Sequence, residues 1–520
     1  MSETNITMAE LEAIVAGNTA GINESWHLVA GILVFMMQAG FALLEVGSVQ
    51  STNAQNILFK NILDACISAI CFWLLGYGFA YGQDAGGFIG TSYFALADPS
   101  FTATASPDTD GLNFHTFFFQ WCFAATAATI VSGSVAERCA LSAYLAYSAI
   151  ITTFVYPIVV HWGWGEGFMS AFASEGSRYM FNGEKSNNFV DFAGSGIVHM
   201  VGGFSGLMGA IFLGPRKGRF LDDGTVVDKP GHNTVLATIG VLILWVGWYG
   251  FNAGSTLCMA GGCSKLASKV AMTTTLAPAA ACLAATLYTY YTTKVWDLTV
   301  AGNAILAGLV SITASCAVVE PIGAFFIGII GAVVYLLAKK MLLKLQVDDP
   351  LDAVPVHGFC GFWGCLSVGI FGTDENAAFA GYKGSSAGYP VFASAEQFGV
   401  QVVGALAICS WTVLTSGLLF YGLKRLNLLR VSDEVEAAGL DLSEHGGTAY
   451  NMTKQILTQS IELPNEHCDV ANNIAGDDGR QEGKISAEKV DLDDVAVDAE
   501  ERKTSSEKVN PKDVKVVETA

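Results

Sequence analysis

The sequence contains few charged residues for its length. Only 14% of its 520 residues are Asp, Glu, Lys or Arg, whereas soluble domains carry about 25%. With 52% hydrophobic residues and a mean hydropathy of +0.44, this scarcity excludes an ordinary soluble domain. It predicts a chain that crosses a membrane many times.

Several motifs are missing as well. No GxxxxGK[ST] phosphate loop is present, so direct coupling to ATP is not expected. The 12 cysteines show no zinc-like Cys/His spacing, and we expect neither a metal nor a cofactor. No basic surface indicates nucleic acid, since the net charge is −20. Residues 1–25 hold four Glu and no Lys or Arg, so they lack the basic segment of a cleaved signal peptide.

Two loop features stay open at the sequence level. Cys258 and Cys263 are close enough to pair, but their spacing does not decide whether they do. Asn5 and Asn23 begin N-x-[ST] triplets and are candidate glycosylation acceptors. Most other cysteines lie in apolar stretches, where they are expected to act as small hydrophobic residues.

Hydropathy predicts eleven membrane-spanning helices of about 17 to 28 residues, long enough to cross the hydrocarbon core. The expected spans are 26–48, 61–82, 114–135, 141–160, 189–214, 233–253, 266–291, 299–317, 321–343, 355–371 and 396–422. An odd number of spans places the two termini on opposite sides of the membrane.

The basic residues predict which side is which. One side would carry Lys60, Arg138, Arg216, Lys217, Arg219, Lys294, Lys339, Lys340, Lys344, Lys424, Arg425 and Arg430. The other would carry only Arg178, Lys185, Lys265, Lys269 and Lys383. Because short basic loops stay in the cytoplasm, the N-terminus is expected outside and the C-terminus in the cytoplasm.

Four regions follow from these patterns. Residues 1–25 are expected as an extracellular N-terminus, 26–425 as an eleven-helix membrane domain and 426–465 as a cytoplasmic regulatory segment. Residues 466–520 are acidic and poor in aromatics, and such a composition predicts disorder.

Ionisable side chains occur inside the apolar segments. The stretch Asp191-Phe-Ala-Gly-Ser-Gly-Ile-Val-His199 lies within the span expected at 189–214. Charged and ionisable groups are costly in hydrocarbon and usually face a protein interior or a pathway. Glu45 and Asp64 are more simply explained as partners of neighbouring helices than as binding residues.

Spans five and ten each carry a histidine followed by glycines, His199-Met-Val-Gly-Gly203 and His357-Gly-Phe-Cys-Gly361. Five helices separate them, so the two five-helix halves would be inverted with respect to each other. Inverted repeats with a functional site between them are typical of transporters. The pattern therefore predicts inverted repeats around a central pore.

The residues of this pore limit its chemistry. It would contain two histidines, but no ring of Arg or Lys and no TVGYG-like carbonyl filter, which fits anion and potassium channels poorly. Neutral imidazoles can hydrogen-bond a small polar molecule or relay a proton. Aromatic clusters at the outer ends of spans three, four and six suit either an interfacial aromatic belt or a cage for a small cation.

These motifs closely resemble the ammonium transporter (Amt/Mep/Rh) family, in its plant and algal branch. Besides Asp191 to His199, four further stretches of the chain are similar to the family's markers. They are Gly40-Phe-Ala-Leu-Leu-Glu45, Ser134-Val-Ala-Glu-Arg138, Gly250-Phe-Asn-Ala-Gly-Ser255 and His357-Gly. The resemblance covers about residues 26–450. It implies eleven helices and a homotrimer in which each subunit has its own pore.

The resemblance also implies roles by position. Phe119, Phe123, Trp164 and Ser255 would form the external site that recruits ammonium, with Asp191 nearby. Phe123 and Phe251 would be the stacked rings that close the pore, and His199, His357 and Trp248 would line it. Asp191 is expected to be mainly structural, as a helix N-cap, with a possible aid to deprotonation. Ser443 stands where plant relatives carry a phosphorylated threonine, which makes it a candidate site for a kinase.

The resulting hypothesis is a non-enzymatic plasma-membrane ammonium transporter, with methylammonium as a substrate analogue. Ammonium would be recruited outside, lose a proton and pass the histidines as ammonia, with or without a coupled proton. The alternative is an ammonium sensor that signals through its cytoplasmic tail and conducts little. A gas channel of the Rh type fits the tryptophan at 164 less well. A membrane hydrolase would need a nucleophile or a metal set near His199, and neither is evident.

Overall fold

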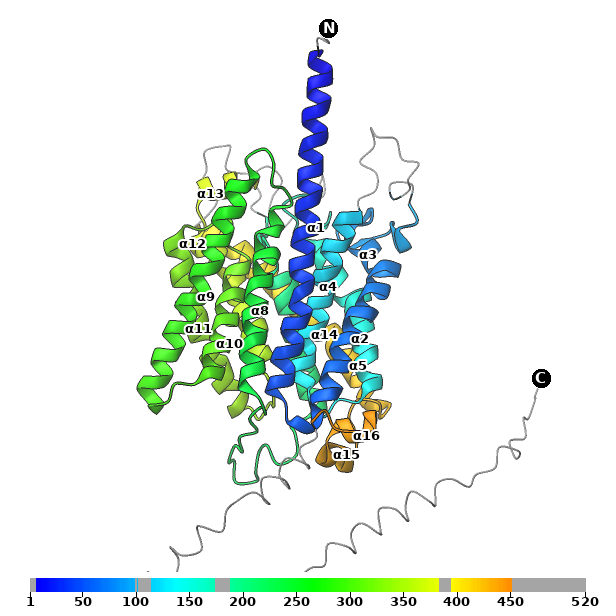
Figure 1. The fold of residues 1–520 in the computed structure, drawn as a ribbon, viewed down its shortest axis with the longest axis vertical. Helices are drawn as coiled ribbons and strands as arrows, with labels where there is room; N and C mark the ends of the chain where they lie inside the picture. The colour runs from blue at the N-terminus through cyan, green and yellow to red at the C-terminus, as the bar shows by residue number, and fades with distance from the viewer. Residues whose placement is uncertain (1–5, 99–100, 102–113, 174–187, 383–393, 451–520) are drawn as a thin grey trace, which may run out of the picture. The chain divides into compact units, whose positions relative to one another are not determined.

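The computed structural model describes residues 6–98, 101, 114–173, 188–382 and 394–450. In this part of the chain, ten helical segments are long and apolar enough to cross a membrane, and the shorter apolar helix Leu298–Thr313 makes an eleventh. They run alongside one another as a helical bundle (Figure 1). The expected all-α polytopic architecture is thereby confirmed, and the number of spans agrees.

The first half of the chain supplies five spans and the short elements between them. These elements are α1 (Met8–Ser48), η1 (Ser51–Asn53), α2 (Ala54–Cys71), η2 (Phe72–Gly76), α3 (Tyr77–Tyr81), β1 (Asp84–Ala85), β2 (Ile89–Gly90), η3 (Phe94–Leu96), α4 (Phe114–Val135), α5 (Leu141–Ile150), η5 (Ile151–Val155), α6 (Tyr156–Gly163), η6 (Ser195–Met200) and α7 (Val201–Leu213).

The second half supplies the other six spans and the C-terminal segment. Its elements are α8 (Thr234–Asn252), η7 (Gly254–Thr256), α9 (Cys263–Thr293), α10 (Leu298–Thr313), α11 (Pro321–Lys344), η8 (Val354–Phe359), α12 (Cys360–Phe371), α13 (Asp374–Phe379), α14 (Ala395–Arg425), α15 (Asp433–Ala438) and α16 (Leu440–His445). The two short strands, β1 and β2, pair antiparallel in a loop.

Proline and glycine explain how α9, α10 and α11 pack closely together. Pro278 lies inside α9, where it removes one hydrogen bond from the helix. Gly308 of α10 and Gly328 of α11 approach the α9 backbone at this point. A Cβ atom at Gly328 would lie only 2.0 Å from the carbonyl oxygen of Ala277, so no larger residue fits there without separating the helices.

Helix α1 is longer than the sequence indicates. The span was expected at 26–48, with residues 1–25 as a separate terminus, but the helix begins at Met8. Thr7 and Glu10 form a reciprocal capping box at this end, which satisfies two amide groups of the first turn. Hydropathy missed the extension because its exposed face contains Glu, Asn and Thr.

The fifth span was also predicted incorrectly at its start. It was expected from residue 189, but the helical backbone begins at Ser195, as the π-helical turn η6. Gly194, just before it, has φ 110°, a conformation that favours glycine. Asp191 therefore precedes the helix and does not lie on it.

The two buried carboxyl groups of the early spans pair with neighbouring helices, as the sequence predicted. Glu45 accepts hydrogen bonds from Ser132 and from Asn61. Asp64 accepts one from the hydroxyl of Tyr144, at 2.5 Å. These contacts tie α1 and α2 to α4 and α5.

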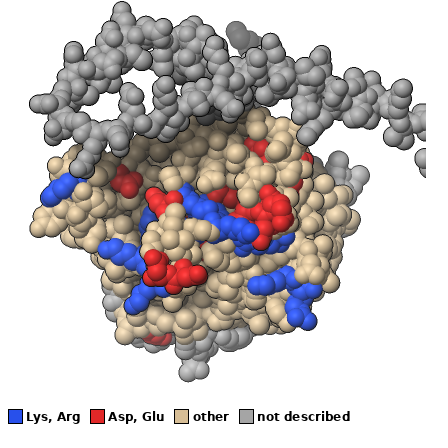
Figure 2. All heavy atoms as spheres, turned by 90° about the horizontal axis from the view of Figure 1, so that it is seen from below, with Lys and Arg blue, Asp and Glu red and all other residues tan. Residues whose placement is uncertain are grey.

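The ends of the bundle differ, and we call them the N-terminal face, from which α1 projects, and the C-terminal face, where α15 and α16 lie (Figure 1). Figure 2 looks onto the C-terminal face, where Lys and Arg side chains lie interleaved with Asp and Glu. Arg216 is the buried centre of this network and pairs with Glu137 and Asp348. Burial opposes ionisation of Asp348, but hydrogen bonds from Arg216 and the charge of Arg138 outweigh it and lower the pKa of Asp348 to about 2.

Candidate functional site

A cavity of about 250 Å³ lies near the N-terminal face. It is lined by all four residues that the sequence suggested for a recruitment site: Phe119, Phe123, Trp164 and Ser255. They come from α4, the end of α6 and the 3₁₀ turn η7. The hydroxyl of Ser255 donates to the carbonyl oxygen of Phe251 at 2.7 Å, so its lone pairs remain available to a donor in the cavity.

Aromatic rings form the walls and the floor of this cavity. The ring centroids of Phe123 and Trp164 lie 5.9 Å apart at 80°, and those of Phe119 and Phe123 lie 4.7 Å apart. Phe123 stacks on Phe251 at 4.0 Å with an interplanar angle of 25°. Both rings of this stack are almost completely buried, so they separate the cavity from the interior beneath it.

The two histidines lie directly beyond the stacked rings. His199 packs 5.4 Å from Phe251 and stacks on Trp248 at 4.9 Å. Its Nδ1 atom lies 3.1 Å from Nδ1 of His357. The indole of Trp248 donates to Thr313 at 2.9 Å, which fixes the ring against which His199 lies.

The Nδ1 contact makes the two imidazoles inequivalent. One Nδ1 must donate a proton and the other must accept it. In a neutral pair, the donating ring keeps a lone pair on Nε2 and the accepting ring carries a proton on Nε2. Nε2 of His199 is buried and has no hydrogen-bond partner among the described residues, so it keeps its capacity to bond a small guest that can donate or accept.

The backbone explains why the two histidines meet. His199 lies in η6 and His357 in η8, two π-helical turns that open spans five and ten. The two segments cross at glycines: a Cβ atom at Gly203 would lie 2.2 Å from the amide nitrogen of Gly358. The pattern of a histidine followed by glycines, which spans five and ten share in the sequence, therefore corresponds to a contact in the fold.

Asp191 holds the start of η6, the turn that contains His199, through hydrogen bonds. Its carboxylate oxygens accept four amide hydrogen bonds of 2.8 to 2.9 Å, from Gly194, Ser195, Gly196 and Ile197. They satisfy the free N–H groups at the start of η6, where a helix favours negative charge. The backbone carbonyl of Asp191 also accepts the indole N–H of Trp164 at 2.7 Å. Asp191 thus orients both the tryptophan and the helix that carries His199.

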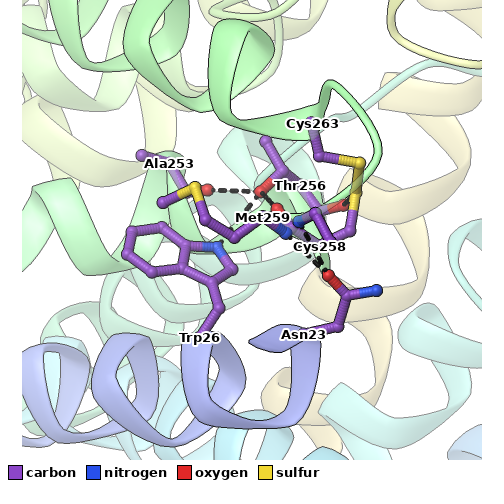
Figure 3. The surroundings of a disulfide bond; sticks show 8 residues. Asn23, Trp26, Ala253, Thr256, Cys258, Met259 and Cys263 are labelled. Carbon is purple, nitrogen blue, oxygen red and sulfur yellow. Dashed lines mark hydrogen bonds between the residues drawn. A yellow bond between two sulfur atoms is a disulfide. The ribbon is translucent and has the colours of Figure 1, made fainter. Parts of the chain in front are cut away.

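A disulfide-closed loop follows η7, the turn that contains Ser255, and is hydrogen-bonded to α1 (Figure 3). Cys258 and Cys263 are bonded, which answers a question that their spacing left open. The side-chain oxygen of Asn23 accepts hydrogen bonds from the amides of Met259 and Ala260, at 2.9 and 3.0 Å. The indole of Trp26 donates to Thr256 at 3.2 Å. These contacts use the carboxamide oxygen of Asn23 and not its Nδ2 atom, to which a glycan would be attached, and Asn5 lies outside the described residues.

Below the histidines the path leads towards the C-terminal face. His357 and Phe41 line a small cavity together with Asn303 and Leu351. Asn303 and Leu351 also line a cavity of about 440 Å³ that opens among Arg216, Arg219, Lys339, Asp349 and Asp352. The interior beneath the histidines is therefore adjacent to a wide polar vestibule.

The sequence missed several residues of this path. Tyr81, Gln120 and Tyr382 line the outer cavity, and Phe41 and Asn303 lie below the histidines. Phe41 lies in the marker from Gly40 to Glu45, but no role was assigned to it, and the others are single polar or aromatic residues in an apolar helix or loop. Gln120 and Asn303 had a usable signal, each as a lone carboxamide within an expected span. In the described ranges, no three His, Cys, Asp or Glu side chains are grouped as a metal site requires.

The C-terminal segment docks on the membrane domain. The carboxylate of Asp441 accepts the amide hydrogens of Gln55 and Asn56 at 3.0 and 2.8 Å, and so caps the start of α2. Arg430 donates to the carbonyls of Leu213 and Pro215. Ser443 is exposed next to these contacts, in α16. The expected acidic tail at 466–520 lies outside the described residues.

These features define a class of protein. Within the described residues, eleven apolar helical segments surround the aromatic rings and the two histidines, which lie between an outer cavity and a polar cavity at the C-terminal face. This is a multi-pass membrane protein.

The chain belongs to the Ammonium Transporter Family, whose sequence model matches residues 25–450. Ammonium transporter 1 member 3 of Solanum lycopersicum is 40% identical over 454 residues, which are 85% of this chain and 95% of the relative. The family resemblance read from the motifs is therefore confirmed, including its plant relatives.

Solved structures show the same fold. A protein titled Sensor Amt Protein matches with a TM-score of 0.72 and 35% identity, over 82% of this chain and 99% of that one. Mep2 of Candida albicans matches with a TM-score of 0.68 and 26% identity, over 79% of this chain and 87% of Mep2.

Proposed function

We propose that the chain moves ammonium across the plasma membrane into the cytoplasm, as a homotrimer with one pore in each subunit. The supporting observation is the uninterrupted series from the outer cavity through Phe123 and Phe251 to His199 and His357. The concentration of Lys and Arg at the C-terminal face supports a cytoplasmic C-terminus and an extracellular N-terminus.

Ammonium is recruited in the outer cavity. Phe119, Phe123 and Trp164 offer their π faces to the cation, at about 0.5 to 2 kcal/mol per ring depending on desolvation. Ser255 accepts one of its N–H bonds. Methylammonium, which keeps three N–H bonds and one positive charge, binds in the same way and serves as the tracer.

The ion loses a proton before it passes the stacked phenyl rings. Moving an unpaired cation from water into a medium of low dielectric costs several kcal/mol or more, and neither Phe123 nor Phe251 offsets this cost. Ammonium therefore splits into ammonia and a proton, and ammonia continues. Asp191 is a weak candidate for the base because its four amide contacts occupy both oxygens, so its role is to orient Trp164 and η6.

The histidine pair then conducts ammonia. The free Nε2 atoms present one acceptor and one donor, which match the N–H bonds and the lone pair of ammonia. The small cavity below His357 leads the molecule to the vestibule at the C-terminal face, where water can protonate it again. The proton either returns to the outer water or follows by its own route, and the second case makes transport electrogenic.

His199→Ala tests the proposal. In oocytes, labelled methylammonium uptake and current are measured for the wild type, for this variant and for His232→Gln, whose histidine lies outside the path. We expect saturable uptake by the wild type and by His232→Gln, and an altered rate or current for His199→Ala. Uptake without current identifies net ammonia passage. If wild-type protein shown to be at the cell surface gives neither uptake nor current, the transporter proposal is wrong.

A sensor is the second candidate. One structural neighbour is titled a sensor, and the C-terminal segment contacts α2 next to the pore-forming helices, where it could report on their state. Such a protein binds methylammonium at the surface but does not accumulate it. The same uptake experiment therefore separates the two candidates.

Regulation by a kinase at Ser443 belongs to this proposal. A phosphate would add nearly two negative charges beside Glu444 and Asp441, which already bind the start of α2. Like-charge repulsion would then weaken the docking of α16.

A further inference from the structure

The first fifteen residues of α1 form a helix with no support from the other described elements. From Met8 to Ile22 every side chain is exposed except the half-buried Thr19. Figure 1 shows this part of α1 extending beyond the other helices. The first side chain of α1 that is hydrogen-bonded to another described element is Asn23, which binds the disulfide loop.

The composition of this segment favours an exposed helix only weakly. It continues the membrane-spanning part of the 41-residue helix α1, so it needs no nucleus of its own. However, Gly17, Asn18, Thr19 and Gly21 follow closely on one another, and each glycine costs about 1 kcal/mol relative to alanine. A packing partner, which the described part of one subunit does not supply, would therefore stabilise this segment.

The exposed apolar residues show the spacing of a coiled coil. They lie on one stripe of positions at alternating intervals of three and four residues. The stripe also includes two polar residues and consists of Met8, Leu11, Val15, Asn18, Ile22, Ser25, Val29 and Ile32. The six apolar members are between 46% and 69% exposed. A repeat of 3.5 residues keeps one seam facing a partner helix along its whole length, and a stripe of two positions per repeat is narrower than the apolar face of a helix packed on a globular surface.

The acidic residues of the segment lie beside this seam or away from it. Glu10 and Glu24 occupy the third position of the seven-residue repeat that starts at Met8, on the side turned away from the partner. Asn18 takes a seam position, the fourth of the repeat, where a polar residue lowers the stability of a coiled coil. With no Lys or Arg in residues 1–25, attraction to an anionic membrane surface is unfavourable.

The membrane anchor determines the partner's orientation. Every copy of the chain carries the same stripe on the same side of the membrane, because α1 continues directly into its membrane-spanning part. Stripes of neighbouring copies therefore run parallel and in register, which is the arrangement that the seam spacing suits. The stripe also continues into the exposed apolar face of the span through Val29 and Ile32.

We propose that residues 8–22 of α1 form a parallel coiled coil with the same segment of neighbouring copies, above the outer surface of the membrane. The pairing rests on the proposed oligomer and orientation, and it is independent of the transported substrate. It assigns the N-terminal extension an assembly role that the pore does not need.

Cysteine cross-linking in the full-length protein tests this pairing. The native chain has no cysteine before Cys66, so an introduced cysteine is the only thiol in the N-terminal segment. Leu11→Cys, Val15→Cys and Asn18→Cys place thiols on the seam, and Ala13→Cys and Ala20→Cys place them on the opposite side. After mild oxidation of intact cells, we expect the seam variants to give at least fivefold more disulfide-linked dimer than the other two.

Three results would overturn the proposal: equal cross-linking at all five positions, which indicates random collisions; no cross-linking on the seam; or a monomeric protein. As a second variant, Val15→Asp in the Asn18→Cys background should abolish most of the cross-linked dimer. Methylammonium uptake is measured in the same cells. Loss of uptake with an intact cross-linking pattern contradicts the proposed function alone, and the reverse result contradicts the coiled coil alone.

Discussion

At the scale of single residues, each ring in the outer cavity has a separable contribution. Phe119 lines the cavity and contacts Phe123, but it takes no part in the stack of Phe123 on Phe251. Its neighbour Phe118 contacts Trp121 instead and does not line the cavity. The two phenylalanines are thus a matched pair for testing recognition of the cation.

Phe119→Leu removes one π face while it keeps an apolar side chain. Because one ring contributes about 0.5 to 2 kcal/mol, we expect the KM for methylammonium to rise by about 2-fold to 30-fold, with a smaller change in maximal rate. Phe118→Leu should leave the KM close to that of the wild type. Equal effects of both substitutions on KM would contradict a role for Phe119 in binding the cation.

At the scale of elements, the hydrogen bonds between α1 and the loop after α8 determine where Ser255 lies. Asn23 binds two backbone amides of this loop and Trp26 binds Thr256, while the disulfide restricts the loop itself. Neither Asn23 nor Trp26 lines the cavity. We therefore regard Asn23 as a positioning residue.

Asn23→Ala leaves the amides of Met259 and Ala260 without their acceptor, and because these groups are only partly buried, the cost is below the roughly 1 to 3 kcal/mol of a buried group. We expect a raised KM with protein still at the cell surface, and Cys258→Ser should act in the same direction. Thr19→Ala, one turn earlier on the same helix, is the control. A fall in surface expression with an unchanged KM would indicate a purely structural role.

The contact between α16 and α2 predicts a second effect at this scale. Ser443→Asp places a negative charge next to Asp441 and Glu444, and we expect uptake to fall while the amount of protein at the surface stays constant. Ser443→Ala should retain uptake, since the serine hydroxyl contacts only carbonyl groups of its own segment. Unchanged uptake by the aspartate variant would argue against Ser443 as a regulatory site.

The elements were largely predictable from the sequence, and the exceptions share one cause. Long apolar runs predicted the spans, and α4 was expected at 114–135 and lies at Phe114–Val135. Met8 to Ser25 was expected to lie before the first span and proves to be helical, and Phe189 to Gly194 precedes the helix that was expected to contain it. Hydropathy records neither feature because it measures burial in lipid. A capping box that begins a polar helix, or a carboxylate that starts a π-helical turn, leaves little trace in hydropathy.

At the scale of the whole molecule, a buried ion network joins distant parts of the chain on the C-terminal face. Arg216, after α7, binds Glu137, after α4, and Asp348, before η8. Arg138 donates to the backbone carbonyl of Asp348 at 2.7 Å. The network therefore connects the first and second halves of the chain.

This network predicts a pH dependence of stability. The pKa of Asp348 is lowered to about 2 from about 3.9 in an unfolded chain. Its carboxylate therefore stabilises the fold above pH 4, by about 2 kcal/mol, and this contribution disappears as the pH falls towards 2. Asp348→Asn should lower the midpoint of thermal unfolding in detergent at pH 7, and the difference from the wild type should shrink near pH 3. A difference that does not depend on pH would contradict the assignment.

The sequence by itself determined the membrane class, the spans, the family and the residue types of the pore. It could do so because hydropathy and short motifs are local properties of the chain. Only the tertiary structure decided that the carboxylate of Asp191 caps η6, that Cys258 and Cys263 are bonded, and that Nδ1 of His199 meets Nδ1 of His357. It also added Phe41 and Asn303 to the path. These contacts join residues across helix crossings, where glycines such as Gly203 determine the distance between backbones, and no local pattern records which segments cross.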